Sequence, residues 1–302
     1  MHLTFRQLQL FKIFSETYSV TATAKKMHVT QPTASMQLKE LTISVGLPLY
    51  EVVGKKIYLT EAGRALASIA QSISQEWESF EQTIASMKGL KTGKLKISVV
   101  STAKYFIPSL VGSFCSEYPD IDIALEVLNR DAVVARLEAN LDDMAIMTQP
   151  PLHLDIEDEI FLDNPLVCIA PRGHKLANKK LKIQDLGNEH FIMRETGSGT
   201  RMSCDLFFKN NKFDPKIRLT LGSNEAIKQA VAGDLGLSIV SIHSLTEHDV
   251  EEMVHILDVD QLPIKSQWHI VTLKGHKLSP IAKVFHDHML NKVKEINLKR
   301  FK

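Results

Sequence analysis

The stretch SVTATAKKMHVTQPTASMQLKELT, residues 19–42, constrains the fold of this chain more than any other part of the sequence. It holds two short helical patterns joined by the turn His28–Thr30. Thr30 is a favoured helix N-cap, and Pro32 is tolerated in the first turn of the helix that follows. Three apolar residues then recur at helical spacings on one face: Ala34, Leu38 and Leu41. The stretch therefore predicts a helix-turn-helix, whose second helix enters the major groove of DNA.

The polar face of this second helix carries the side chains that we expect to meet DNA. Hydroxyl and amide groups at its N-terminus suit contacts with phosphates and base edges. Helical hairpins with polar faces also occur in proteins that do not bind DNA, so the pattern alone leaves both readings open. The candidate DNA-contacting residues are Thr21, Thr30, Gln31, Pro32, Thr33, Ser35, Met36, Gln37 and Lys39.

The distribution of charge favours DNA binding. Residues 1–60 hold seven Lys and Arg side chains and three acidic ones, a net charge of +4. The whole chain carries +1, so residues 61–302 carry −3. A basic N-terminal part on a slightly acidic body is the asymmetry expected when one domain meets phosphate and the rest does not.

Flanking patterns complete a winged helix-turn-helix domain over residues 1–60. Residues 5–15 read as a first helix, with apolar residues at intervals of three. Residues 49–53 and 57–59 read as the strands of a hairpin with the basic tip Gly54-Lys55-Lys56. A wing of this kind lies along the DNA backbone or in the minor groove, so Lys55 and Lys56 are further candidate DNA contacts. The alternative for both lysines is a solvated turn.

A long amphipathic helix is expected over residues 61–88. Its apolar residues mix spacings of three and four, close to a heptad repeat: Ala62, Leu66, Ile69, Ile73, Trp77, Phe80, Ile84 and Met87. We expect this stripe to pair with a second copy of the chain, which would set two recognition helices on successive half-sites. The alternative is that the helix packs on its own chain. The run GLKTG at 89–93 is then a hinge.

From residue 94 onward the pattern changes to alternating strands and helices. Strands at 95–100, 121–128 and 143–148, with helices between them, form a βαβαβ run that implies a parallel sheet. Later strands (165–170, 191–193, 217–221, 237–241) and helices (200–210, 224–232) predict a second lobe. The last strand, 268–273, and helix, 279–298, are expected to return to the first lobe. The predicted class is a multidomain α/β protein whose effector domain, 94–302, has two lobes, about 94–164 plus 268–302 and about 165–267.

Three loops of the predicted effector domain suit a small anionic ligand. Ligands of open α/β sheets bind at the carboxyl ends of parallel strands and at helix N-termini. Backbone N–H groups, hydroxyls and an arginine in the run ETGSGTR, 195–201, suit a phosphate or carboxylate. Gly-rich helix starts are also often simple turns, and Asn224 is equally suited to be an N-cap. The candidate effector-binding residues are Ser101, Thr102, Lys104, Thr148, Glu195, Gly199, Thr200, Arg201, Asn224 and Glu225.

The sequence disfavours several classes of function. No apolar run approaches the roughly 20 residues needed to cross a bilayer, and the N-terminus lacks a signal-peptide cleavage pattern, so we expect a cytoplasmic protein. His286-Asp287-His288 looks like a metal motif, but neighbours two apart on a helix face away from one another, so we expect a surface position and no metal site. The motifs HExxH and GxSxG are missing. We expect no catalytic residue and no cofactor; an enzyme or a transport-type binding protein built on 94–302 is the alternative.

The chain resembles the LysR-type transcriptional regulators along its whole length. FRQLQLFKIF, TQPTASMQLKEL and PLYEVVGKKIYLTEAGRAL carry the resemblance in the N-terminal part. VVSTAKYFIPSLVGSFC, FLDNPLVCIAP, RETGSGTRM and LGSNEAIKQAVAGDLGLSIVS look like the subgroup that regulates RuBisCO and Calvin-cycle operons. The resemblance implies a winged helix-turn-helix, a dimer-forming linker helix and a periplasmic-binding-protein-like effector domain, in a regulator controlled by a metabolite.

The resemblance also implies the partners. The effector would be a phosphorylated metabolite, such as a sugar intermediate, or a nicotinamide nucleotide. The macromolecular partners would be double-stranded promoter DNA, further copies of the chain in a dimer and a tetramer, and RNA polymerase. We expect the effector to change the angle between the lobes, and the linker helices to pass that change to the recognition helices. The sequence leaves activation and repression as open alternatives.

Overall fold

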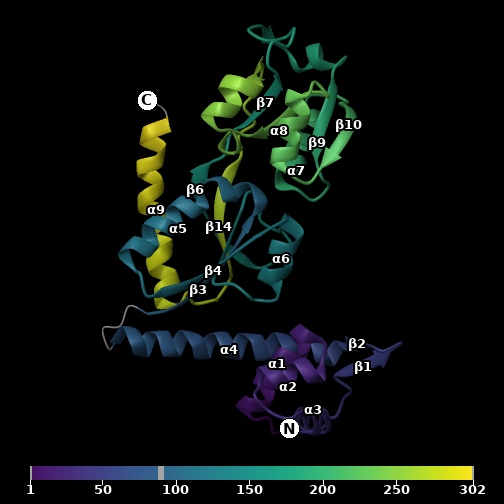
Figure 1. Cartoon of the computed structure of the whole chain (residues 1–302), viewed down its shortest axis with the longest axis vertical. Helices are drawn as coiled ribbons and strands as arrows, with labels where there is room; N and C mark the ends of the chain where they lie inside the picture. The colour runs from purple at the N-terminus through teal and green to yellow at the C-terminus, as the bar shows by residue number, and fades with distance from the viewer. Residues whose placement is uncertain (1, 88–91, 301–302) are drawn as a thin grey trace. The chain divides into compact units, whose positions relative to one another are not determined.

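The computed structural model describes residues 2–87 and 92–300, and the side chains within 2–85 and 92–293. The chain forms two compact units, an N-terminal unit with helices α1 to α4 and a second unit that runs from β3 to α9 (Figure 1). Of the hinge expected at 89–93, residues 89–91 lie outside the described residues.

Three short helices open the N-terminal unit: α1 (Phe5–Thr17), α2 (Val20–Lys26) and α3 (Gln31–Val45). Each begins after a hydroxyl side chain that accepts a hydrogen bond from the backbone N–H three residues on; these N-caps are Thr4, Ser19 and Thr30. The face predicted to be apolar in α3 is fully buried, and it packs in one core with Phe11 and Phe14 of α1. The predicted helix-turn-helix is confirmed.

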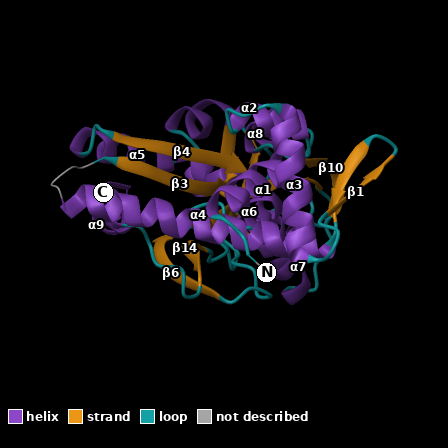
Figure 2. Cartoon of the chain, turned by 90° about the horizontal axis from the view of Figure 1, so that it is seen from below, coloured by secondary structure: helices purple, strands orange, loops and turns teal. Residues whose placement is uncertain are grey.

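The wing is an antiparallel hairpin of β1 (Tyr50–Val53) and β2 (Lys56–Leu59), which extends away from the helices in Figure 2. Val53 lies opposite Lys56, so the loop consists of Gly54 and Lys55, with φ of 56° and 71°. A two-residue type I′ turn requires positive φ at both positions. The predicted hairpin is confirmed, although Lys56 begins β2 instead of belonging to the tip.

Helix α4 (Glu61–Met87) follows the wing directly, and its predicted apolar stripe divides in two. Leu66 and Ala70 are buried in the core of the N-terminal unit. Four large apolar side chains of the stripe are exposed, namely Ile69, Ile73, Trp77 and Phe80, and Ile84 is half-buried. The ring of Trp77 still lies 5.4 Å from that of Phe5 in α1. Packing on its own chain therefore uses one edge of the stripe and leaves the other uncovered.

The first lobe of the second unit is built on a five-stranded sheet in the order β4-β3-β5-β14-β6. The strands are β3 (Gly93–Val100), β4 (Ile121–Leu128), β5 (Met144–Met147), β6 (Ile156–Asp163) and β14 (Gln267–Leu273). β3 is parallel to β4 and β5, as the βαβαβ run predicts. β14 is antiparallel to β5 and β6, so the chain returns to this lobe after building the second one.

Helices cover both faces of this sheet. α5 (Ile107–Glu117) and α9 (Pro280–Arg300) share one apolar cluster with the sheet, and α6 (Arg130–Glu138) shares another. The expectation that the motif His286-Asp287-His288 lies at the surface is wrong for His288, which is 8% exposed. Its Nε2 lies 2.7 Å from Ser113 Oγ of α5, because α5 covers the face of α9 that would be free on an isolated helix.

The second lobe is a mixed sheet with helices α7 (Gly199–Asn210) and α8 (Asn224–Ala232). Its longer strands are β7 (Leu166–Pro171), β9 (His190–Arg194), β10 (Lys216–Leu221), β11 (Ser238–Ser241) and β12 (Val254–Ile256). β9 is parallel to β10, and β7 is antiparallel to β11 and β12. A parallel bridge between Phe191 and Leu237 joins the two groups. β12 and the short pair β8 (Lys180–Leu181) and β13 (Asp258–Val259) were not predicted, because two or three residues carry no period.

Candidate functional site

The face of α3 expected to meet DNA points into solvent. The exposed members of the predicted set on this helix are Gln31, Pro32, Ser35, Met36 and Lys39. Thr33 and Gln37 are half-buried, and Thr21 is exposed on α2. The Thr30 side chain caps α3, and its Oγ1 lies 2.8 Å from Thr33 Oγ1. The structure thus leaves a polar surface at the N-terminal half of α3, over a face that is entirely apolar and buried.

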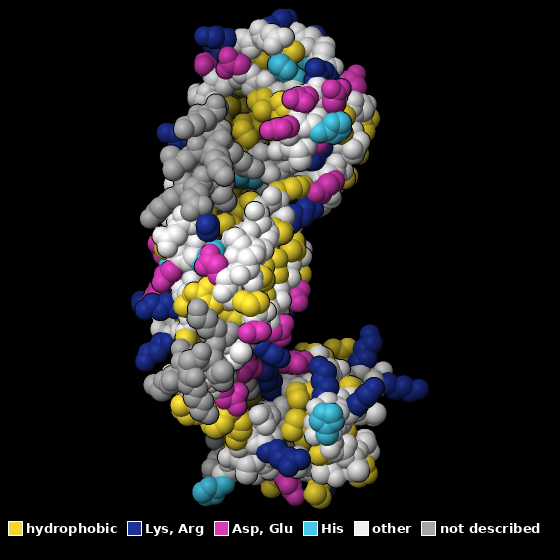
Figure 3. Space-filling view, turned by 60° about the vertical axis from the view of Figure 1, so that its left-hand side comes forward, with side chains coloured by type: hydrophobic (Ala, Val, Ile, Leu, Met, Phe, Trp, Pro, Cys, Tyr) yellow, Lys and Arg dark blue, Asp and Glu magenta, His cyan; other side chains and the backbone are white. Residues whose placement is uncertain are grey.

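Basic side chains accompany this surface. Lys55 at the wing turn and Lys56 at the start of β2 are both exposed. Figure 3 shows Lys and Arg side chains projecting from the N-terminal unit. A helix with exposed small polar groups and a basic wing matches the docking geometry of a winged helix-turn-helix on a duplex.

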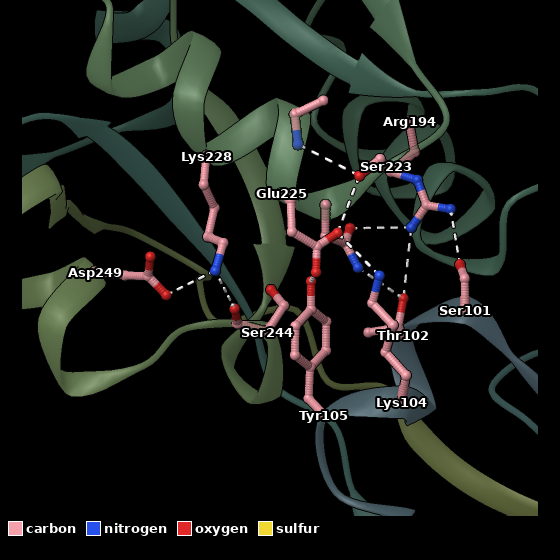
Figure 4. A network of polar contacts seen from close by, with 12 residues as sticks. Ser101, Thr102, Lys104, Tyr105, Arg194, Ser223, Glu225, Lys228, Ser244 and Asp249 are labelled. Atoms are coloured by element: carbon pink, nitrogen blue, oxygen red, sulfur yellow. Dashed lines mark hydrogen bonds and ion pairs between the residues drawn. The ribbon is translucent and has the colours of Figure 1, made fainter. Parts of the chain in front are cut away.

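The cleft between the two lobes of the second unit is organised by an arginine that the sequence prediction left out. Arg194 ends β9 in the second lobe and is 4% exposed. Its Nη2 donates to Ser101 Oγ at 3.2 Å, and its Nη1 donates to Thr102 Oγ1 at 3.4 Å, both in the first lobe (Figure 4). A buried guanidinium therefore bridges the lobes through two hydroxyls that the sequence had selected.

Two further predicted residues complete the set around Arg194. The Glu195 carboxylate accepts from Arg194 Nε and Nη2 at 2.7 and 2.8 Å. Burial acts to raise the pKa of Glu195, but Arg194 holds it below its ordinary value. Asn224 accepts from Arg194 Nη1 at 3.0 Å and donates to Thr102 Oγ1 at 3.1 Å. Asn224 is not the N-cap of α8, because Ser223 takes that role.

A second contact between the lobes lies at the rim of the cleft. Glu225 of α8 accepts from Lys104 Nζ at 2.9 Å and from Tyr105 Oη at 2.6 Å. Burial raises the pKa of Tyr105, and the Glu225 carboxylate raises it further. Burial would also raise the pKa of Glu225, but the hydrogen bonds from Tyr105, Lys104 and Ser223 lower it to about 2. Glu225 therefore stays ionised and joins the lobes through a charged pair.

Thr148, Gly199 and Thr200 also meet at the junction of the lobes. A Cβ atom placed on Gly199 would lie 2.5 Å from Thr148 Oγ1, so a side chain at this position would require the Thr148 hydroxyl to move. Thr200 is buried in the first turn of α7. Arg201, by contrast, turns away from the cavity: its Nε donates to Asp205 at 2.8 Å and its Nη1 to the carbonyl oxygen of Arg194 at 3.0 Å.

The cleft has a narrow part and a wide part. The narrow part lies beside Arg194 and is lined by Ser101, Thr102, Thr148, Glu195 and Thr200, with a free volume of ≈ 10 Å³, about the space of one water. The wide part holds ≈ 1080 Å³. Arg130 and Thr148 line both parts. The arrangement offers a buried cation and hydroxyls at one end and room for a small metabolite at the other.

Sequence reasoning missed Arg194, Tyr105 and Arg130. Arg194 ends a strand one position before the selected loop, so extending each loop by one residue into its strand would have found it. Arg130 begins α6 directly after β4, at the same sheet edge. Tyr105 carries no signal in the sequence, because its role depends on α8 lying opposite.

The described residues contain no group of three His, Cys, Asp or Glu side chains that could hold a metal ion. None of the helices in the described ranges is long and apolar enough to span a membrane. Cys168 and Cys204 are buried thiols, and burial raises the pKa of both, which makes them poor nucleophiles.

Two family models match the chain. The model "Bacterial regulatory helix-turn-helix protein, lysR family" matches residues 5–64, and the model "LysR substrate binding domain" matches residues 88–294. The second match alone covers more than half of the chain. Together they span the exposed face of α3, the wing and the whole cleft.

Known proteins of similar sequence are regulators. The chain is 43% identical over 287 residues to the HTH-type transcriptional activator CmpR of Synechocystis sp., with 95% of this chain and 94% of that protein covered. It is 40% identical over 289 residues to a RuBisCO operon transcriptional regulator of Acidithiobacillus ferrooxidans, covering 95% and 94%. The solved regulatory domain of Synechocystis CcmR in complex with 2-PG is 44% identical, covers 68% of this chain and 99% of its own, and superposes with a TM-score of 0.66.

Proposed function

Because this chain belongs to the LysR family of transcriptional regulators, we propose that it controls carbon-fixation or related central-metabolism genes in response to a phosphorylated metabolite. Regulators of this family bind promoter DNA and form oligomers, and they are not enzymes. The observation that carries the proposal is the pairing, in one chain, of an exposed polar α3 with a cleft built around buried Arg194.

The DNA-binding part of the proposal rests on α3 and the wing. Ser35 and Met36 lie in one turn on the exposed side of α3 and Lys39 lies in the next, where side chains reach base edges and phosphates. Lys55 and Lys56 contact the backbone or minor groove beside them. The other selected residues, Thr21, Thr30, Gln31, Pro32, Thr33 and Gln37, position the N-terminus of α3 against a phosphate.

The effector part of the proposal rests on the cleft. The solved relative at 44% identity carries 2-PG, which supports 2-phosphoglycolate or a similar small phosphorylated acid as the ligand here. Arg194, Ser101, Thr102 and the N-terminus of α7 receive one anionic group, and the wide part of the cleft holds the rest. Arg201 does not contact the anion but positions Arg194, because it donates a hydrogen bond to the Arg194 carbonyl oxygen.

Signal transfer is proposed to run from the cleft to paired DNA-binding units. The exposed stripe on α4 pairs with a second copy, and two such dimers form a tetramer, so that each promoter meets two or more recognition helices. Closure of the lobes around the effector shifts the population of tetramer states that differ in the bend of the DNA. Contact with RNA polymerase completes the regulatory output, in the cytoplasm where the promoter lies.

Fluorescence anisotropy with the gene's own upstream region tests the proposal. The full-length protein is expected to bind this fragment with an affinity on the order of 10³ times that for random DNA of equal length. Affinity should fall steeply between 50 and 200 mM salt. Lys39→Ala should weaken binding and reduce the salt slope by about one, while Lys209→Ala, which removes the same charge from α7, should leave both unchanged.

Two results would argue against the proposal. Equal binding of the upstream region and random DNA would remove the regulator function. Specific DNA binding that does not respond to 2-phosphoglycolate, phosphate or a nicotinamide nucleotide would support the DNA-binding function and contradict the proposed class of effector. The nicotinamide nucleotide is the second candidate ligand, because the wide part of the cleft has room for a larger molecule.

A further inference from the structure

The hydrogen bonds of Arg194 are saturated by the protein itself. A guanidinium has five N–H donors. Arg194 Nε donates to Glu195, Nη1 donates to Asn224 and Thr102, and Nη2 donates to Ser101 and the second oxygen of Glu195, so five acceptors surround five donors. An incoming anion therefore has no free donor on this side chain and must replace one of the existing acceptors.

Glu195 is the acceptor best placed to leave. It binds Arg194 through both carboxylate oxygens, at 2.7 and 2.8 Å, in the two-pronged geometry that a phosphate or carboxylate ligand would also adopt. It is the anion among the four residues, and its side chain is 29% exposed, so it can move into water without losing its charge. Asn224 and Thr102 are buried and hydrogen-bonded to each other, and their departure would leave polar atoms unsatisfied.

The free space beside Arg194 also indicates that Glu195 must leave before an anion can bind. Glu195 lines the narrow part of the cleft, whose ≈ 10 Å³ holds about one water and no phosphate group. Space for an anion beside Arg194 appears when the Glu195 side chain swings out. The backbone at this point stays in place, because Arg201 Nη1 holds the carbonyl oxygen of Arg194 at 3.0 Å.

We propose that Glu195 is an internal competitor of the effector: its carboxylate occupies the anion position on Arg194 in the ligand-free protein and yields it to the phosphate or carboxylate of the bound metabolite. This exchange rests on the proposed effector site. Glu195 is the first residue of the loop that leads into α7, and Ser198 N donates to its carbonyl oxygen at 3.2 Å. The exchange moves the Glu195 side chain. Glu195 thus sets the affinity of the cleft for the effector.

Calorimetric titration of the full-length protein with 2-phosphoglycolate, and separately with inorganic phosphate, tests the exchange. Glu195→Gln keeps the shape of the side chain and removes its charge, so both ligands should bind about tenfold more tightly than to the wild type. Glu195→Ala removes the competitor altogether and should show a gain of the same sign. Circular dichroism checks that each variant is folded.

Asp131→Asn is the matched control. Its carboxylate lies beside the same loop, 2.9 Å from where a Cβ on Gly197 would stand, but is not among the acceptors of Arg194. Loss of this charge should change the affinity less than about twofold, because its exposed position is screened. A gain equal to that of Glu195→Gln would mean that general electrostatics, and not exchange, governs affinity, and would overturn the proposal.

The remaining outcomes distinguish failure of the Glu195 exchange from failure of the proposed effector site. Unchanged or weaker binding in both Glu195 variants would overturn the exchange and make Glu195 a structural partner of Arg194, while the effector site stands. Arg194→Gln should abolish binding of both ligands in either background. If the wild type bound neither ligand, or if Arg194→Gln bound as well as the wild type, the proposed effector site itself would fail, and the exchange with it.

Discussion

Gly63 lies where the first turn of α4 passes the backbone of the segment before the wing. A Cβ atom at this position would lie 1.8 Å from the carbonyl oxygen of Leu49, and backbone cannot move aside as a flexible side chain can. Gly63→Ala should therefore destabilise the N-terminal unit by about 2–4 kcal/mol, which urea unfolding followed by circular dichroism would measure. Gly112→Ala in α5 meets no atom within 4 Å and should stabilise by roughly 0.5–1 kcal/mol. Equal effects at the two sites would contradict the clash.

The rim contact between the lobes should depend on pH. The pKa of Glu225 in the folded protein is about 2, below the 4.5 of the free side chain, so at low pH the unfolded chain takes up the proton first. The stability that Glu225 contributes is therefore present above pH 4.5 and is lost as pH falls toward 2. We expect the urea midpoints of the wild type and Glu225→Gln to differ most at pH 6, to differ less at pH 3 and to converge near pH 2. The difference should be about 1 kcal/mol or less, because a half-exposed pair is screened.

At the level of single residues, the sequence could place most of the cleft but not its centre. Strand ends and helix starts predict that Ser101 and Thr102 of the first lobe and Asn224 of the second lobe face one cleft, and they do. Which cation holds them together depends on side-chain direction at the last residue of β9, and this is why Arg194 was missed while Arg201 was chosen. Arg201 instead pairs with Asp205 one turn away, an arrangement that local spacing alone favours.

At the level of elements, the exposed stripe of α4 leads to a prediction about assembly. Ile69 and Phe80 are 56% and 54% exposed, and burying such a side chain is worth about 1.5–3 kcal/mol. Ile69→Glu or Phe80→Glu should therefore weaken the dimer roughly ten- to a hundredfold in sedimentation experiments. Ser68→Glu puts the same charge on an exposed position about 100° around the helix and should not. Dimers of wild-type strength in the Ile69 and Phe80 variants would place the interface elsewhere.

Strands could be predicted where apolar residues form a regular pattern in the sequence. They were missed where the strand is stabilised by contacts with residues far away in the sequence. β6 carries the acidic run Glu157-Asp158-Glu159, which reads as a loop in isolation. In the fold it is an edge strand, and two of these acids meet histidines of adjacent elements: Asp158 lies 2.7 Å from His269 Nδ1, and Glu159 lies 3.0 Å from His286 Nε2. Pairings between residues more than one hundred positions apart leave no local period to detect.

At the level of the whole molecule, the two units must be coupled if the cleft is to control a promoter. Thermodynamic linkage makes that coupling reciprocal: if the effector changes the affinity for DNA by a given factor, DNA changes the affinity for the effector by the same factor. For a coupling typical of such systems, the factor is about 5–150. A ligand that binds both states equally would shift nothing, however tightly it binds.

This reciprocity can be measured with 2-phosphoglycolate and the upstream DNA fragment. We expect the ratio of DNA affinities with and without the ligand to equal the ratio of ligand affinities with and without DNA. Arg194→Gln should retain ligand-free DNA binding, because Arg194 lies in the second unit and α3 with its wing lies in the first, and 2-phosphoglycolate should no longer change its DNA affinity. Loss of ligand-free DNA binding in this variant would instead show that the Arg194 cluster maintains the assembled protein, and that the cleft acts on DNA through stability and not through a shift between two states.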